Sequence, residues 1–185
     1  MADTTDFRNG FTMTLEDAIY SIVEFQHVKP GKGGAFVRTK LKNVRTGAVI
    51  DRTFRSGDKV DEIRVEKREM QFLYSESEFF HFMDSETYEQ TQLRRETVGD
   101  TARFLVENET TYVSVAEGVP LAVELPNFVE LTVEHTEPGV RGDTAQGATK
   151  PATLETGAVV SVPLFVNRGE KLKIDTRTGE YVERV

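Results

Sequence analysis

Alternating apolar and polar residues recur along almost the whole 185-residue chain, interrupted at short intervals by Gly-containing turns. A period of two sends successive side chains to opposite faces of a β-strand. Clear runs lie at residues 36–41, 49–54 and 129–133. Short strands at this spacing are typical of barrels and sandwiches. The sequence therefore predicts an almost all-β protein, whose one helix occupies residues 101–106 with Asp100 as its N-cap.

Polar breaks divide this pattern into three blocks of about 60 residues, each the size of a small barrel. The predicted domains are residues 1–64, 65–128 and 129–185. The third contains a polar segment at residues 137–152 that is longer than most loops of compact domains. Because this segment leads straight into the hydrophobic run 158–166, we expect it to join two strands of one domain and to bind something.

The net charge of −8 opposes binding of nucleic acid over the whole surface. The charges are unevenly distributed, however. The first block has 11 basic and 9 acidic residues, the second 5 and 13, and the third 7 and 9. Between residues 25 and 55 there are 8 basic residues and one acid, Asp51. This concentration favours a local contact with an anionic partner, although a solvated strand face explains the same charges.

The most distinctive local motif is residues 29–34, KPGKGG, which lies between two strand-like runs. Glycine permits the positive φ angles that a tight reversal needs, so this segment is expected to be the tip of a hairpin. We assign Pro30, Gly31, Lys32 and Gly33 to the tip. Glycines do not shield the Lys32 amine, which such a tip can carry into a narrow space. The alternative is an ordinary Gly-rich turn with a solvated lysine.

A row of basic residues leads to this tip. Strand alternation places three of them on the same face as Phe36, and a fourth lies beside the tip itself. We expect the row to support a contact made by Lys32. The four residues are Lys29, Arg38, Lys40 and Lys42.

Motifs for catalysis or metal binding are missing from the sequence. There is no cysteine, which excludes disulfides, thiol nucleophiles and cysteine-ligated metals. The three histidines are isolated, and neither HExxH nor GxSxG occurs, so we expect no metal, no cofactor and no catalytic residue. Three acids flank a run of phenylalanines, where desolvation could raise a carboxyl pKa, but solvent-facing acids on a half-buried strand explain them better. The histidines are His27, His81 and His135, and the acids are Glu76, Glu78 and Asp84.

Targeting and membrane segments are not evident either. No apolar run approaches the roughly 20 residues that cross a bilayer. The first residues lack the basic and apolar regions of a secretory signal. We therefore expect a cytoplasmic protein with no membrane partner.

Motifs in all three blocks match one known family. Those in the first two blocks and the long loop lie at residues 28–33, 126–131 and 142–144. The most extensive are C-terminal, at residues 150–154, 156–160, 162–166 and 175–181. On these residues, the whole chain resembles bacterial elongation factor P. The resemblance implies an SH3-like (KOW-type) N-terminal barrel followed by two OB-fold barrels, in an elongated, tRNA-like shape.

The resemblance also implies a monomeric, non-enzymatic translation factor. Such a factor binds the 70S ribosome between the peptidyl-tRNA and exit sites and relieves stalling at consecutive prolines. Lys32 takes the position of the family's tip residue, which reaches toward the acceptor end of the peptidyl-tRNA. In many members a modifying enzyme extends that residue. A lysine here excludes the arginine glycosylation of some members, whereas the choice among lysine modifications stays open.

Five further residues follow from the resemblance. Gly142, Asp143 and Thr144 match the loop that faces the exit-site codon region of the mRNA. Tyr181 and Arg184 match C-terminal positions implicated in ribosome or tRNA contact. Judged without the family, the last two are an aromatic side chain packed on a barrel and a solvated arginine.

Three other functions stay open at this point. The closest is an elongation factor P-like paralogue, whose tip is expected to differ from Pro-Gly-Lys-Gly. A generic OB-fold protein that binds single-stranded nucleic acid would need aromatic platforms in a basic groove, whereas the second and third blocks are acidic. A carboxylate-based β-barrel hydrolase would turn over a substrate.

Overall fold

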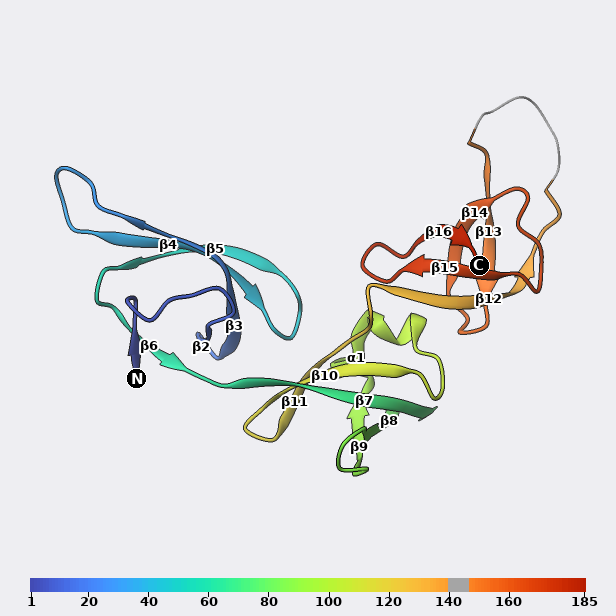
Figure 1. The fold of residues 1–185 in the computed structure, drawn as a ribbon, viewed down its shortest axis with the longest axis horizontal. Coiled ribbons are helices and arrows are strands. Elements are labelled where there is room, and N and C mark those ends of the chain that lie inside the picture. The colour runs from blue at the N-terminus through green and yellow to red at the C-terminus, as the bar shows by residue number, and fades with distance from the viewer. Residues whose placement is uncertain (140–146) are drawn as a thin grey trace. The chain divides into compact units, whose positions relative to one another are not determined.

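The computed structural model describes residues 1–139 and 147–185. The chain is built almost entirely of β-strands, which form three sheets (Figure 1). The all-β prediction is therefore confirmed. Within the described residues, no helix is both long enough and apolar enough to span a bilayer.

The first sheet has six strands in the order β1-β6-β2-β3-β4-β5. Its core is apolar, with Phe11 and Met13 at most 1% exposed. Strands β3 and β4 are rich in β-branched and aromatic residues and stay paired out to Val28 and Phe36, so they form a long hairpin. We call this hairpin, residues 18–43, the arm. The strands are β1 (Ala2–Asp3), β2 (Thr12–Leu15), β3 (Ala18–Val28), β4 (Phe36–Asn43), β5 (Val49–Arg55) and β6 (Lys59–Glu62).

A bulge in β3 decides which side chains face this core. Ile22 pairs with Leu41, but Glu24 rather than Val23 pairs with Lys40, so Val23 is the extra residue. Such a bulge reverses the alternation of the strand beyond it. Glu24 therefore lies on the outer face of the sheet, although simple alternation would place it on the same side as the buried Ile22.

The second sheet has five strands in the order β11-β10-β7-β8-β9. Aromatic side chains pack within it, and the ring centroids of Phe72 and Phe82 lie 5.4 Å apart. Beside them Asp84 is buried, and its carboxylate accepts the backbone N–H groups of Glu86 and Thr87. These bonds stabilise the turn after β8. The strands are β7 (Val65–Glu76), β8 (Phe79–Asp84), β9 (Gln90–Arg94), β10 (Thr110–Ala116) and β11 (Val119–Glu124).

The helix predicted at residues 101–106 is wrong in type and in its bounds. Helical structure begins earlier, as α1 (Arg95–Val98), and continues as a 3₁₀ helix, η1 (Gly99–Phe104). Gly99 ends α1 with a φ of 61°, after which the chain winds more tightly. Asp100 thus lies inside η1 and is not its N-cap.

The third sheet has five strands in the order β14-β13-β12-β15-β16. Its core contains Leu131 and Leu172, both 0% exposed, together with Phe104 from the end of η1. The Thr156 hydroxyl also donates a 2.6 Å hydrogen bond to the Arg103 carbonyl, which holds η1 against this barrel. The strands are β12 (Phe128–Thr136), β13 (Thr149–Leu154), β14 (Val159–Pro163), β15 (Lys171–Asp175) and β16 (Glu180–Arg184).

The loop predicted at residues 137–152 is too long at its C-terminal end. Strand β13 begins at Thr149 and pairs with β12 on one side and β14 on the other. Lys150 in this strand is buried, and its Nζ donates a 2.7 Å hydrogen bond to the Glu137 carbonyl. The polar composition of this segment gave no sign of the start of β13, which is stabilised by pairing with β12 and β14. Residues 140–146 lie outside the described residues.

Contacts within the chain define two compact units. One contains Met1–Arg68 and Val113–Ala122, and the other contains Glu69–Tyr112 and Val123–Val185. Most of the hairpin formed by β10 and β11 thus falls in the first unit, although its strands belong to the second sheet.

The turn between β15 and β16 holds a carboxylate with an unusually low pKa. Arg177 donates two side-chain hydrogen bonds to Asp175, of 3.0 Å from Nε and 2.6 Å from Nη2. Together with the backbone N–H groups of residues 177 and 178, they lower the pKa of Asp175 from 3.8 to about 2, and the side-chain bonds contribute most. Because the folded pKa lies below the unfolded value, the carboxylate stabilises the fold above about pH 4, and this contribution disappears as the pH falls toward 2.

Arg177→Ala should therefore raise the pKa of Asp175 toward, but not fully to, its ordinary value. The backbone N–H bonds from residues 177 and 178 persist in the variant and keep part of the shift. A carboxyl-carbon NMR titration of both proteins measures the change. An unaltered pKa in Arg177→Ala would show that the guanidinium is not the cause.

Candidate functional site

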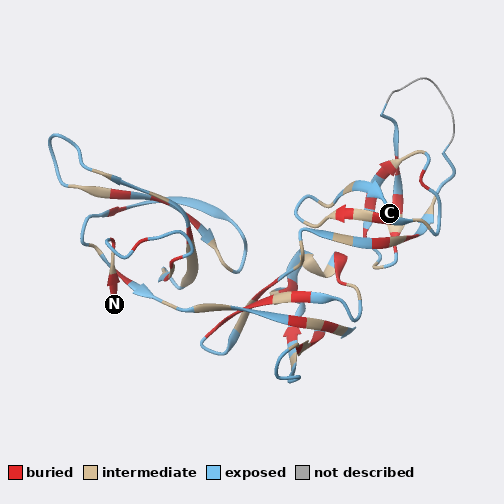
Figure 2. Ribbon diagram, viewed as in Figure 1, coloured by how far each residue is buried: buried red, intermediate tan, exposed pale blue. Residues whose placement is uncertain are grey.

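The tip of the arm is exposed as the sequence predicts. Residues 29–34 connect β3 to β4, and every one of them is exposed (Figure 2). Gly33 has a φ of 109°, a conformation that L side chains rarely adopt. A Cβ added at Gly31 or Gly34 would meet nothing within 4 Å, so these glycines keep the tip slim rather than packed.

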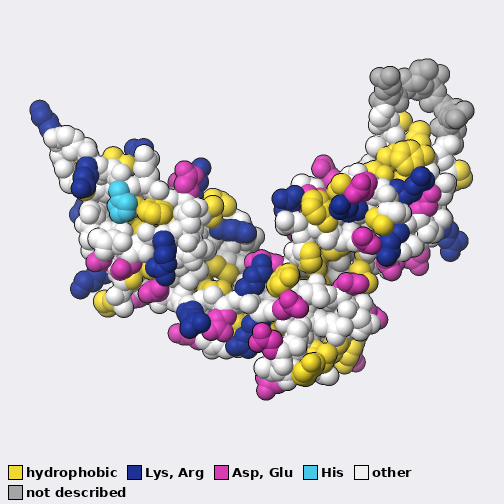
Figure 3. Space-filling model, in the orientation of Figure 1, with side chains coloured by type: hydrophobic (Ala, Val, Ile, Leu, Met, Phe, Trp, Pro, Cys, Tyr) yellow, Lys and Arg dark blue, Asp and Glu magenta, His cyan; other side chains and the backbone are white. Residues whose placement is uncertain are grey.

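Lys32 projects from this tip without a partner. Within the described part of the chain, its amine makes no hydrogen bond, ion pair or ring contact. Open space surrounds the neighbouring Gly31 and Gly34, which shows that the tip is not folded back onto its own barrel. Figure 3 shows Lys and Arg side chains at the end and along the flank of the arm. The arm is therefore a narrow β-hairpin that carries the exposed Lys32 amine at its tip.

Strand β4 alternates between buried and exposed side chains, as predicted. Two of the buried residues belong to the core of the first sheet, and the third, Thr39, donates a hydrogen bond to the Arg52 carbonyl. The exposed residues are basic and lie on the opposite face. The buried set is Val37, Thr39 and Leu41, and the exposed set is Arg38, Lys40 and Lys42. Lys29 is exposed as well. The sequence thus places the basic row on the correct face.

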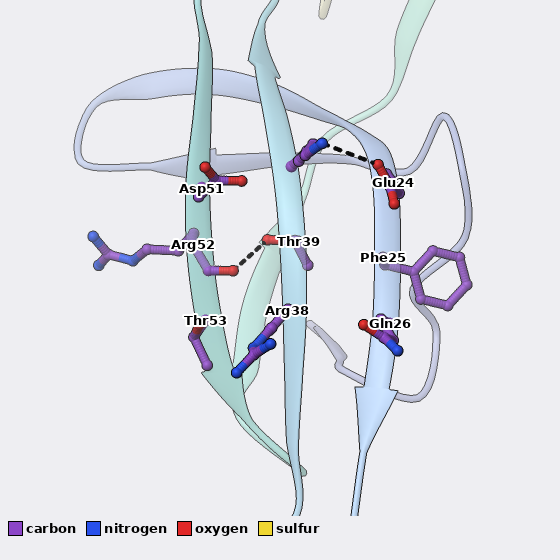
Figure 4. Close-up of a pocket in the computed structure, with 9 residues that line it drawn as sticks. Glu24, Phe25, Gln26, Arg38, Thr39, Asp51, Arg52 and Thr53 are labelled. Carbon is purple, nitrogen blue, oxygen red and sulfur yellow. Dashed lines mark hydrogen bonds and ion pairs between the residues drawn. The ribbon is translucent and has the colours of Figure 1, made fainter.

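The charge of this row is not uniform, however. Lys40 lies between Glu24 on β3 and Asp51 on β5, which are its register partners on the two sides. Its Nζ lies 3.3 Å from Oε2 of Glu24 (Figure 4). One acid therefore pairs with this lysine, and a second lies opposite it on the neighbouring strand. Directly opposite residues on neighbouring strands share a face, so Glu24, Lys40 and Asp51 form a line across β3, β4 and β5. We call this line the Lys40 row.

A depression of about 330 Å³ covers this part of the outer face. Its walls come from three neighbouring strands, as the close-up shows (Figure 4). The side chain of Arg38 lies on the side of the Lys40 row that is nearer the tip, between Gln26 and Thr53 in the register. In the depression, the line that contains Arg38 has no acidic residue, and the adjacent Lys40 row has two. The lining residues are Glu24, Phe25, Gln26, Arg38, Thr39, Lys40, Asp51, Arg52 and Thr53.

The C-terminal residues identified by resemblance have structural partners. Tyr181 is half-buried and packs against the core of the third sheet. Arg184 forms a 3.0 Å ion pair with Glu170, and its guanidinium carbon lies 5.7 Å from the ring centroid of Phe165. Phe165 is 58% exposed and was not predicted, because no local pattern separates an exposed aromatic from a buried one. The predicted loop residues Gly142, Asp143 and Thr144 lie outside the described residues.

Known protein families account for nearly the whole chain. A profile described as "Elongation factor P (EF-P) KOW-like domain" matches residues 3–60. Another, "Elongation factor P (EF-P) OB domain", matches residues 65–123, and a third, "Elongation factor P, C-terminal", matches residues 129–184. The chain belongs to the elongation factor P family. The arm and Lys32 thus lie in the KOW-like domain of an elongation factor P, and Tyr181 and Arg184 lie in its C-terminal domain.

Relatives with the same name are similar over their full length. An elongation factor P of Acidothermus cellulolyticus is 60% identical over 184 residues, which cover 100% of this chain and 98% of the relative. That of Pelotomaculum thermopropionicum is 57% identical over 185 residues, 100% of both chains. These matches and the family profiles together support a role as a translation elongation factor.

A solved structure is similar in fold. The eukaryotic translation initiation factor 5A from Methanococcus jannaschii superposes with a TM-score of 0.51 at 21% sequence identity, covering 66% of this chain and 92% of that one. Together with the KOW-like and OB profiles, this likeness confirms the predicted class, an SH3-like (KOW-type) domain with OB-fold barrels.

Proposed function

We propose that this elongation factor P binds the 70S ribosome beside peptidyl-tRNA and speeds peptide-bond formation at consecutive prolines. Lys32 acts by touching the acceptor end of the peptidyl-tRNA. The observation that carries this proposal is the exposed, unpartnered Lys32 amine at the end of a two-stranded arm. The protein works as a monomer in the cytoplasm, and its C-terminal domain lies toward the mRNA in the exit site.

The mechanism is positioning rather than chemistry at a side chain. Proline is a poor donor and acceptor of the peptide, so its reaction depends strongly on how the two reactants are held. Well-oriented reactants gain several kcal/mol over free ones, and small displacements lose much of that gain. The paired strands of the arm fix where its tip emerges, and the charge of the exposed Lys32 amine attracts RNA phosphates. A lysine-modifying enzyme that lengthened this amine would extend its reach.

Reconstituted translation tests this function directly. Adding the protein should accelerate synthesis of a triple-proline reporter by roughly 10- to 100-fold and leave a reporter without consecutive prolines unchanged. Binding to ribosomes that hold peptidyl-tRNA should weaken as salt is raised. Equal acceleration of both reporters, or none of either, contradicts the proposal.

A further inference from the structure

Apart from Lys42, which lies toward the body of the sheet and has no partner among the described residues, the basic residues of the arm and of β5 fall into two groups by their partners. Toward the body of the sheet, Lys40 is paired with Glu24, and Arg52 on β5 lies 3.1 Å from Glu16. Nearer the tip, the described residues supply no acidic partner to any basic side chain. The basic residues of this second group are Lys29, Lys32, Arg38 and Arg55.

Arg38 and Arg55 are both neighbours of one aromatic residue on the outer face, Phe36. Phe36 is half-buried and is the register partner of Arg55 on β5. The guanidinium carbon of Arg38, two residues along β4, lies 5.4 Å from the centre of the Phe36 ring. The nearby Asp58 carboxylate accepts the backbone N–H of Arg55 at 2.8 Å. The Arg55 guanidinium itself makes no hydrogen bond, ion pair or ring contact among the described residues.

Guanidinium groups in this setting suit phosphate oxygens. Arginine presents a planar fork of donors that matches phosphate with two hydrogen bonds, and for Arg38 the contact with the Phe36 ring restrains its orientation in advance. In the register, Gln26 and Thr53 flank Arg38 and add polar groups to the same row. The next row, with Glu24 and Asp51 around Lys40, repels phosphate.

We propose that Arg38 and Arg55, arranged around Phe36, form a phosphate-binding site for an RNA strand, and that the Lys40 row marks its end. The proposal rests on the proposed function, in which this strand belongs to the acceptor end of the peptidyl-tRNA. The proposal separates two members of the basic row expected from the sequence. Arg38 contacts RNA, whereas Lys40 is paired with Glu24. Arg55 is one of the eight basic residues between residues 25 and 55, and only the register of β5 places it beside Phe36.

Binding to ribosomes that hold peptidyl-tRNA, measured at several KCl concentrations, tests the site. Arg38→Gln and Arg55→Gln should each weaken binding about tenfold and reduce the slope of log affinity against log salt by about one. The matched control is the double variant Glu24→Gln with Lys40→Gln, which removes an ion pair at no net change in charge. Its affinity should stay within about twofold of wild type, with an unchanged slope. Circular dichroism and the melting temperature verify that all variants fold.

The outcomes separate the site from the function. If the wild-type protein binds and accelerates the triple-proline reporter while both arginine variants match it, the phosphate site is wrong and the proposed function stands. An equal loss in the Glu24/Lys40 double variant overturns the boundary at Lys40. If wild-type protein does not bind these ribosomes, both proposals fail.

Discussion

Replacing Lys32 with alanine should leave the fold intact and remove most of the acceleration at triple prolines, a loss of roughly 10- to 100-fold. The side chain has no partner in the described structure, so its removal breaks no internal contact. Surface changes of this kind alter stability by about 0.5 kcal/mol or less. The rate of the proline reporter at saturating protein measures the effect, and thermal unfolding verifies stability.

Lys59→Ala is a matched control for this prediction. Lys59 is an exposed lysine of β6 in the same sheet, so its removal changes the net charge equally without touching the tip. This variant should keep full activity. Lys32→Arg adds a second comparison, since it keeps the positive charge but not the primary amine. Full activity of Lys32→Ala would show that the tip amine is not the working group.

Replacing Phe104 with alanine should destabilise the C-terminal barrel by about 3–5 kcal/mol. The side chain is 4% exposed and belongs to the core of the third sheet, although η1 precedes that sheet in the chain. Its Cζ also lies 3.6 Å from where a Cβ at Gly179 would stand, so the ring reaches the turn between β15 and β16. Removing the ring leaves a cavity that rigid strands around it fill only in part.

Urea unfolding followed by circular dichroism measures this loss. Phe165→Ala is the matched control, because it removes the same ring from a position that is 58% exposed, and it should cost about 1 kcal/mol or less. Similar costs for the two variants would contradict the assignment of Phe104 to the core.

The strands were more predictable than the segments between them. β4 alternates strictly, so its buried and exposed faces could be assigned from residues 36–42 alone. β9 is largely polar, and the start of β13 lies in a polar stretch, so neither shows an apolar pattern, and both exist because neighbouring strands pair with them. The helix prediction at residues 101–106 failed for a related reason. Gly99 ends α1 just before this segment, and Phe104 packs in a core whose other residues come later in the chain.

The sequence by itself determined the exposed lysine tip and the face of the basic row. Both depend on local rules, namely the freedom of glycine and the two-residue repeat of a strand. Only the tertiary structure decided which basic residues stay unpaired. The bulge at Val23 turns Glu24 outward beside Lys40, and the register of β5 brings Asp51 to its other side and Arg55 to Phe36. These neighbours come from separate strands. A shift of one residue in the pairing of those strands would place different side chains beside Lys40 and Phe36.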